Sequence, residues 1–226
     1  MLKAVIFDFD GVITDSEILH FRAFNAILNQ HGVELTKPQY YQSYLGLTDA
    51  DCYRTLIDEG RLKIDPSQIN DLVAHKNKVF EELARTEGSI IDGVREFLDT
   101  LSHGGVPLAI CSGALRAEIE LILEQAKLRD RFDAIVSAED VERGKPHPDG
   151  FLLALKELND RGFGPIAPAH CAVVEDSHWG LQAARSAGMR TIAVTNTYDA
   201  DQLQTADKVV DRLDNLTLED LNHLCS

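Results

Sequence analysis

Residues 4–15 read AVIFDFDGVITD. The apolar run Ala4–Phe7 predicts a buried strand, and Asp8 and Asp10 follow it directly, at a turn that contains Gly11. Side chains two residues apart on a strand share a face, and the turn lets both carboxylates converge on one small volume. Carboxylates that close repel each other unless a cation lies between them, and Mg²⁺ binds one or two carboxylates together with a substrate phosphate. The alternative is a solvated acidic strand end followed by a turn.

Further apolar runs alternate with helical patterns along the rest of the chain. The expected strands are Pro107–Cys111, Ala134–Val136, Cys171–Val174 and Thr191–Val194. The expected helices between them are Gly93–Leu101, Leu115–Ala126, Asp149–Leu158 and His178–Ala187. Near-continuous apolar strands are typical of a parallel sheet that is covered on both faces. The alternation therefore predicts right-handed crossovers and a doubly wound α/β fold.

One interval breaks this alternation, because residues 16–87 have helical patterns throughout. The expected helices there are Glu17–Gln30, Lys37–Tyr44, Asp49–Glu59 and Pro66–Arg85. An interval of about 70 residues is far too long for an ordinary connection between a strand and a helix. We therefore expect a helical cap domain at 16–87, inserted into a core domain of residues 1–15 and 88–226. The alternative is that these helices thicken one face of the sheet.

Composition limits the possible partners and the cellular location. The 226 residues carry a formal net charge of −15, which argues against nucleic acid and against an anionic membrane surface as partners. The N-terminal residues lack the pattern of a signal peptide, and no apolar run has transmembrane length. The four cysteines lie far apart without a CxxC pair, so we expect reduced core thiols. We expect a cytoplasmic monomer.

Polar residues follow several of the expected strands. Ligands of open α/β sheets bind beyond the carboxyl ends of the strands, so these residues are candidate partners for Asp8. Ser112 can hold phosphate oxygens, Lys145 can balance the charge of a transferring phosphoryl group, and Asp176 can ligate a metal. Glu175 can ligate the metal or organise its bound water. Separately, each has an ordinary alternative as a turn serine, a surface lysine or a helix cap.

Together these motifs resemble those of the haloacid dehalogenase superfamily, and the resemblance extends over essentially the whole chain. Its most specific part is DFDGVITDSE, supported by Ser112, by Lys145 in GKPHPD and by the acidic pair in EDSHWG. The resemblance implies that Asp8 is a nucleophile that forms an aspartyl-phosphate and that Asp10 is the acid/base. It also implies that Mg²⁺ is bound by Asp8, by the main-chain carbonyl of Asp10 and by Asp176. Asp10 points to phosphatases and phosphomutases within the superfamily.

Within the superfamily, the helical insertion resembles the cap of the β-phosphoglucomutase-like subgroup. His20 and Lys76 match residues that this subgroup's mutases use around the sugar phosphate, and residues 46–49 resemble its specificity loop. The substrate-binding candidates are His20, Gly46, Asp49, Lys76, Gly113 and Arg116. Asp49 stands where the mutase has an arginine that grips the phosphate not being transferred, and Gly113 and Arg116 replace part of its polar and basic segment. Arg54 and Arg116 are the residues that could compensate. These departures favour hydrolysis over mutation.

The sequence leaves three functions open. The first is a Mg²⁺-dependent phosphohydrolase that acts on a small phosphate ester, with a sugar phosphate as the expected substrate. The second is a sugar phosphomutase, in which a sugar hydroxyl replaces water as the acceptor. The third is a non-catalytic protein that binds a phosphorylated ligand. Two further side chains have structural expectations: Trp179 is expected to pack between helix and sheet, and His147 to be structural.

Overall fold

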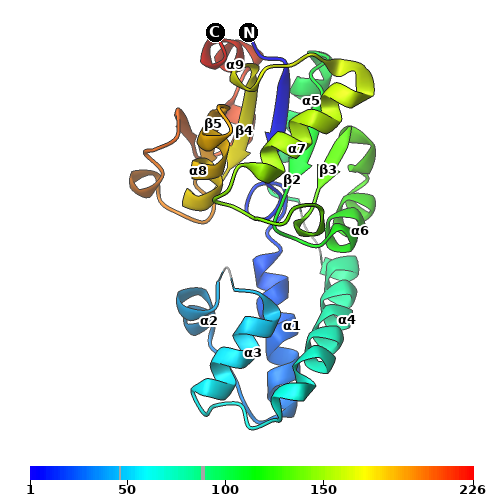
Figure 1. The fold of residues 1–226 in the computed structure, drawn as a ribbon, viewed down its shortest axis with the longest axis vertical. Coiled ribbons are helices and arrows are strands. Elements are labelled where there is room, and N and C mark those ends of the chain that lie inside the picture. The colour runs from blue at the N-terminus through cyan, green and yellow to red at the C-terminus, as the bar shows by residue number, and fades with distance from the viewer. Residues whose placement is uncertain (46, 88–89) are drawn as a thin grey trace. The chain divides into compact units, whose positions relative to one another are not determined.

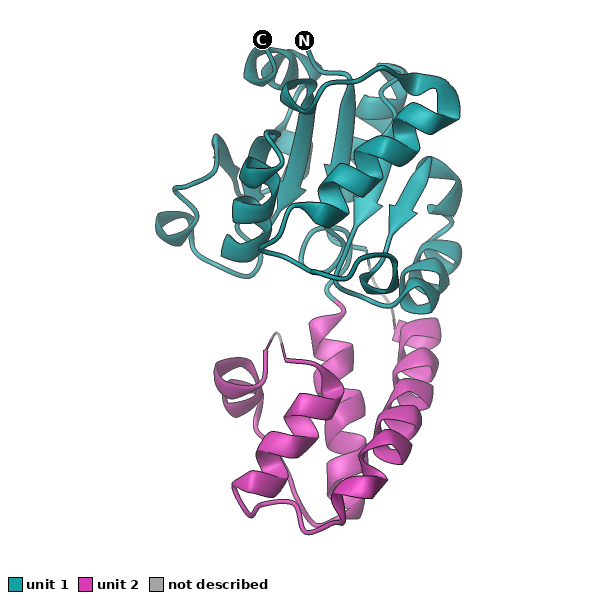
Figure 2. Cartoon of the chain, in the orientation of Figure 1, with its two compact units in different colours: residues 1–15, 89–226 teal, residues 16–88 magenta. Residues whose placement is uncertain are grey.

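The computed structural model describes residues 1–45, 47–87 and 90–226. The chain forms two compact units, one of residues 1–15 and 89–226 and the other of residues 16–88 (Figure 2). The larger unit contains all the strands of the described chain, and the smaller unit is helical. None of the described helices combines the length and the apolar character needed to cross a membrane.

The sheet of the larger unit has six parallel strands. In spatial order these are β3 (Ala134–Val136), β2 (Leu108–Cys111), β1 (Ala4–Phe7), β4 (Cys171–Glu175), β5 (Arg190–Val194) and β6 (Lys208–Val210). The chain builds outward from β1 to β3 and then returns to the other side of β1. This doubly wound topology is the predicted one. It creates a switch point between β1 and β4, which is where open α/β sheets bind ligands.

Helices cover both faces of this sheet (Figure 1). Ala4 and Ile6 of β1 share a core cluster with residues of α7 (Asp149–Leu158) and α8 (His178–Ser186). Phe7 points to the other face, where its ring meets Phe97 of α5 (Val94–His103). Successive side chains of β1 point to opposite faces of the sheet, and because helices cover both faces, every side chain of β1 is buried. The remaining long helix of this unit is α6 (Arg116–Ala126).

Two elements near the C-terminus were not predicted from the sequence. Strand β6 consists of three half-buried residues, and helix α9 (Leu218–Leu224) is only seven residues long, so neither contains a long apolar pattern. Helix α9 lies beside the first residues of the chain, where the Met1 amino group donates to the Cys225 carbonyl at 2.7 Å. Figure 1 shows the two termini next to each other.

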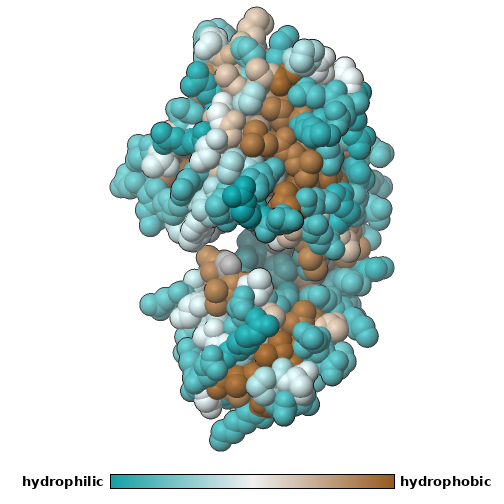
Figure 3. All heavy atoms as spheres, in the orientation of Figure 1, coloured by the Kyte–Doolittle hydropathy of each residue, from teal (hydrophilic) through white to brown (hydrophobic). Residues whose placement is uncertain are grey.

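The expectation for Trp179 is wrong. Trp179 is the second residue of α8 and is 52% exposed, whereas Leu181, Ala183 and Ala184 supply the buried face of that helix. Other large exposed apolar side chains sit on separate elements, and hydrophilic residues cover most of the face in Figure 3. Scattered apolar residues of this kind are normal for a protein surface.

The helical unit contains α1 (Glu17–Gln30), α2 (Lys37–Ser43), α3 (Asp49–Asp58) and α4 (Ile69–Glu87). Thr36 and Thr48 cap α2 and α3, because each hydroxyl accepts a bond from a backbone amide in the first turn. Phe24, Tyr44 and Tyr53 lie in its own hydrophobic core. Residues 66–68 form a short 3₁₀ turn before α4, so the predicted helix Pro66–Arg85 begins three residues later in the structure.

Candidate active site

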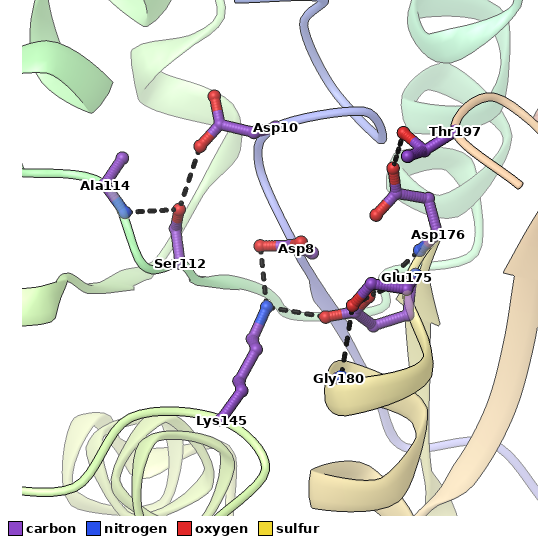
Figure 4. Close-up of polar contacts among 10 residues, drawn as sticks. Asp8, Asp10, Ser112, Ala114, Lys145, Glu175, Asp176, Gly180 and Thr197 are labelled. Atoms are coloured by element: carbon purple, nitrogen blue, oxygen red, sulfur yellow. Dashed lines mark hydrogen bonds and ion pairs between the residues drawn. The ribbon is translucent and has the colours of Figure 1, made fainter. Parts of the chain in front are cut away.

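The carboxyl ends of β1, β2 and β4 bring the predicted core residues together (Figure 4). Asp8 follows β1 directly, and its backbone amide donates to the Val174 carbonyl at 2.9 Å. Lys145 Nζ lies 2.7 Å from Asp8 Oδ1 and 2.6 Å from Glu175 Oε1. Asp8 is 8% exposed and Glu175 is fully buried. The ammonium group of Lys145 therefore bridges two buried carboxylates, and the alternative of a surface lysine is wrong.

The second oxygen of Glu175 is also fully engaged. Glu175 Oε2 accepts from the Asp176 amide at 3.0 Å, from the Ser177 amide at 2.9 Å and from the Ser177 hydroxyl at 2.8 Å. Ser177 Oγ in turn accepts from the Gly180 amide at 3.1 Å, so Ser177 is the cap of α8 and Asp176 is not. A Cβ atom at position 180 would lie 1.6 Å from Glu175 Oε1, which explains the glycine in EDSHWG. Glu175 thus fixes the position of Lys145.

Asp8, Glu175 and Asp176 form a buried acidic group in which one carboxylate oxygen of each lies within 4.8 Å of the others. With all three ionised and Lys145 charged, two negative charges remain in excess. Burial raises the pKa of Asp8 well above its ordinary range, and Glu175 and Asp176 add to that effect while Lys145 opposes it. Burial, then Glu175, raises the pKa of Asp176 to about 7. A divalent cation would relieve this repulsion.

The donor set fits Mg²⁺, which prefers carboxylate oxygens and usually keeps several waters. Asp8 and Asp176 are the residues that would hold the ion, since both oxygens of Glu175 are engaged by Lys145 and by donors at the start of α8. The turn at Gly11 passes close to this place. Gly11 has φ +74°, and a Cβ atom there would lie 1.8 Å from Asp176 Oδ2. A side chain at position 11 would therefore overlap the Asp176 carboxylate.

Asp10 and Ser112 lie on the opposite side of Asp8 from Asp176 (Figure 4). Ser112 Oγ donates to Asp10 Oδ2 at 3.5 Å and accepts from the Ala114 amide at 3.0 Å. The Ser112 amide donates to the Val136 carbonyl at 2.9 Å, which holds the end of β2 against β3. No atom lies within 4 Å of a Cβ placed on Gly113, so the backbone there is open to an approaching group. Asp10 and Ser112 therefore form a second polar pair beside Asp8.

Lys145 stays charged in this setting. Burial by itself lowers the pKa of its ammonium group, but Asp8 and Glu175 outweigh burial and hold it above its ordinary value. The ammonium also lies 5.3 Å from the centre of the Phe151 ring. A permanent positive charge at the carboxyl edge of the sheet is suited to binding a phosphoryl group.

Arg116 and Arg54, the two candidates for binding a second phosphate group, have other partners. Arg116 donates to the Ile135 carbonyl at 2.8 Å and to Asp140 Oδ2 at 2.7 Å. Arg54 lies 2.6 Å from Asp51 Oδ1, one turn earlier in α3. The structure thus engages both guanidinium groups within their own units, and a substrate-binding role for Arg116 stays a prediction.

The predicted cap residues His20, Asp49 and Lys76 lie together in the helical unit, whereas Gly46 lies outside the described residues. Lys76 is only 1% exposed, so the alternative of a solvated lysine is wrong. Its Nζ lies 2.9 Å from Asp49 Oδ2 and 2.6 Å from His20 Nδ1. The His20 ring stacks on Phe80 with a centroid distance of 4.1 Å. Because an ammonium group only donates, His20 Nδ1 accepts, and the ring proton of neutral His20 lies on Nε2.

This cluster predicts a pH-dependent stability. Burial, and then the charge of Lys76, lower the pKa of His20 well below its ordinary value of 6.5. Below about pH 6.5 this histidine is protonated in the unfolded chain but stays neutral in the folded protein. The free energy of unfolding therefore falls as the pH decreases. We expect His20→Gln to reduce this dependence, measured by urea unfolding at about pH 7.5 and about pH 5.5. His31→Gln, at an exposed position, is the control. An unchanged pH dependence in His20→Gln would contradict the assignment.

The sequence analysis missed two residues that contact the group around Asp8 and Asp176. They are Asn196 and Thr197. Asn196 Nδ2 donates to the Gly11 carbonyl at 2.7 Å, and the Thr197 hydroxyl donates to Asp176 Oδ2. Both follow β5, so the rule that sites lie at the carboxyl ends of strands could have found them. Polar residues are common in loops, so these two gave no distinct signal in the sequence.

Comparison with known proteins gives consistent results. A sequence model described as haloacid dehalogenase-like hydrolase matches residues 5–194. The phosphorylated carbohydrates phosphatase of Thermotoga maritima is 31% identical over 192 residues, covering 84% of each chain. Beta-phosphoglucomutase of Bacillus subtilis is 30% identical over 222 residues, covering 96% of this chain and 93% of its own. The crystal structure of CbbY from Rhodobacter sphaeroides in complex with phosphate superposes with a TM-score of 0.85 at 26% identity, covering 98% of this chain and 100% of that one.

The doubly wound sheet and the buried group of carboxylates and lysine at its switch point are those of an enzyme from the phosphatase and phosphomutase class. The chain belongs to the haloacid dehalogenase-like hydrolase family. The resemblance inferred from the motifs is thereby confirmed.

Proposed function

We propose that this protein is a Mg²⁺-dependent phosphohydrolase that acts on a small phosphorylated metabolite, with a sugar phosphate as the expected substrate. The observation that carries the proposal is the bridge of Lys145 between Asp8 and Glu175 at the carboxyl edge of the sheet. It places one fixed cation beside the candidate nucleophile. The name of the Thermotoga maritima relative, a phosphatase of phosphorylated carbohydrates, supports the substrate class.

In the proposed reaction, a carboxylate oxygen of Asp8 attacks phosphorus and the ester P–O bond breaks. Asp10 gives a proton to the leaving oxygen, so the alcohol departs neutral and an aspartyl-phosphate remains. Asp10 then accepts a proton from the attacking water, and inorganic phosphate leaves as the Asp8 carboxylate is restored. Lys145 and the Ser112 hydroxyl hold phosphoryl oxygens during both steps. A Mg²⁺ ion held by Asp8 and Asp176 would neutralise charge on the phosphoryl group.

The pairing of Asp49 with Lys76 favours hydrolysis over mutation. A phosphomutase of this kind must hold a second phosphate group while the first is transferred. Asp49 lies 2.9 Å from the Lys76 ammonium, so the pair has no net charge with which to attract that group. We further propose that residues 16–87 act as a cap domain that selects the substrate.

The proposal predicts release of inorganic phosphate from a panel of sugar and other metabolite phosphates with Mg²⁺. We expect phosphate and the free alcohol to form in equal amounts from at least one compound. A second reaction contains β-glucose 1-phosphate with a trace of its bisphosphate. Conversion there into glucose 6-phosphate without phosphate release would identify a mutase. Binding of a sugar phosphate without turnover at any Mg²⁺ concentration would instead favour a non-catalytic protein.

A further inference from the structure

The loop that follows β5 reaches back to the turn after β1. The Thr195 amide donates to the Val210 carbonyl at 3.0 Å, which anchors the start of the loop on β6. The next residue, Asn196, donates its side-chain amide to the Gly11 carbonyl at 2.7 Å. Thr197 donates its hydroxyl to Asp176 Oδ2 (Figure 4). Two consecutive side chains thus hold the turn that contains Asp10 and the carboxylate of Asp176.

The contact among these segments is tight. A Cβ atom at position 11 would lie 1.8 Å from Asp176 Oδ2 and 2.9 Å from Thr197 Oγ1. The Gly11 backbone, Asp176 and Thr197 therefore lie too close together for a side chain at position 11. Thr197 engages one oxygen of Asp176, and Figure 4 shows the other oxygen on the side of Asp8. A carboxylate held at one oxygen cannot rotate freely, so its second oxygen keeps one direction.

We propose that Thr197 and Asn196 are positioning residues for the divalent cation. Thr197 orients Asp176, and Asn196 holds the Asp10–Gly11 backbone beside it. The inference rests on the proposed function, because it concerns the metal site of the same reaction. Groups that hydrogen-bond to metal ligands set the ligand direction, and their loss typically weakens metal binding by about 10–100-fold. Both side chains are exposed, so they contribute through these bonds and not through the hydrophobic core.

The test compares Thr197→Val, which removes only the hydroxyl, with Thr197→Ser, which keeps it. Affinity for Mn²⁺ is measured by calorimetry or electron paramagnetic resonance on the enzyme without substrate. We expect Thr197→Val to bind Mn²⁺ about tenfold more weakly than the wild type and Thr197→Ser to recover most of that loss. The Mg²⁺ concentration for half-maximal phosphate release should shift in the same direction. Thr100→Val is the matched control, because that hydroxyl bonds to the Glu96 carbonyl within α5.

Asn196→Leu gives an independent second test, since it frees the Gly11 carbonyl and leaves Thr197 in place. We expect weaker Mn²⁺ binding there as well. Wild-type Mn²⁺ affinity in Thr197→Val, or no recovery of affinity in Thr197→Ser, would overturn the positioning role. In either case, phosphate release by the wild type would still support the proposed function. A wild-type enzyme that binds no Mn²⁺ would overturn both. A loss of binding in the Thr100→Val control equal to that in Thr197→Val would also overturn the inference.

Discussion

Replacing Asp8 by asparagine is expected to lower phosphate release by at least about a thousandfold, because the amide cannot act as the nucleophile. Asp8 is the carboxylate that Lys145 holds at 2.7 Å, and its backbone is fixed by the Val174 carbonyl. The substitution is nearly isosteric, so the geometry around it should survive. The measurement is inorganic phosphate release at saturating Mg²⁺ with a substrate from the panel.

The matched control for this variant is Asp160→Asn, at an exposed ion pair with Lys156 on the surface of the same unit. It makes the same chemical change away from the site and should leave turnover at the wild-type level. Intact-mass measurement after rapid quenching should find covalent phosphate on the wild type and none on Asp8→Asn. Normal turnover in Asp8→Asn would remove Asp8 from the mechanism.

Replacing Lys145 by methionine is expected to lower the free energy of unfolding by about 3 kcal/mol without divalent metal, because it leaves buried carboxylates without their cation. Glu175 is fully buried and its Oε1 lies 2.6 Å from Lys145 Nζ. The raised pKa of Lys145 means that this charge persists across the neutral range. Urea unfolding of both proteins measures the difference. Turnover should fall as well, since the phosphoryl group loses its fixed positive partner.

Three comparisons make this prediction specific. Lys156→Met removes an exposed lysine whose ion pair contributes little, so its stability should stay within about 0.5 kcal/mol of the wild type. Adding Glu175→Gln to Lys145→Met should recover part of the loss, because the amide carries no charge. Mg²⁺ should stabilise Lys145→Met more than the wild type, since it supplies positive charge beside the same carboxylates. Equal stability of Lys145→Met and wild type would show that the bridge contributes no stability.

The sequence alone predicted the class of fold, which the structure confirms, and the candidate residues of the central site. Strand β1 and helices α1 and α7 lie at their predicted positions, because each has a continuous apolar run or a clear period and a strong local boundary. Residues that end parallel strands necessarily meet at one edge of the sheet. The sequence alone therefore groups Asp8, Ser112 and Glu175 at this edge, and the motif around Lys145 adds it to the group.

Only the tertiary structure decided which partners these residues have. Local pattern contains no information about contacts between distant segments, such as the bond of Thr197 to Asp176 or the pairing of Asp49 with Lys76. The exposure of Trp179 likewise depends on which face of α8 meets the sheet. Burial and pairing are set by packing over long sequence separations. They decide the charges and directions of the side chains in the site, whereas the sequence decides which side chains are present.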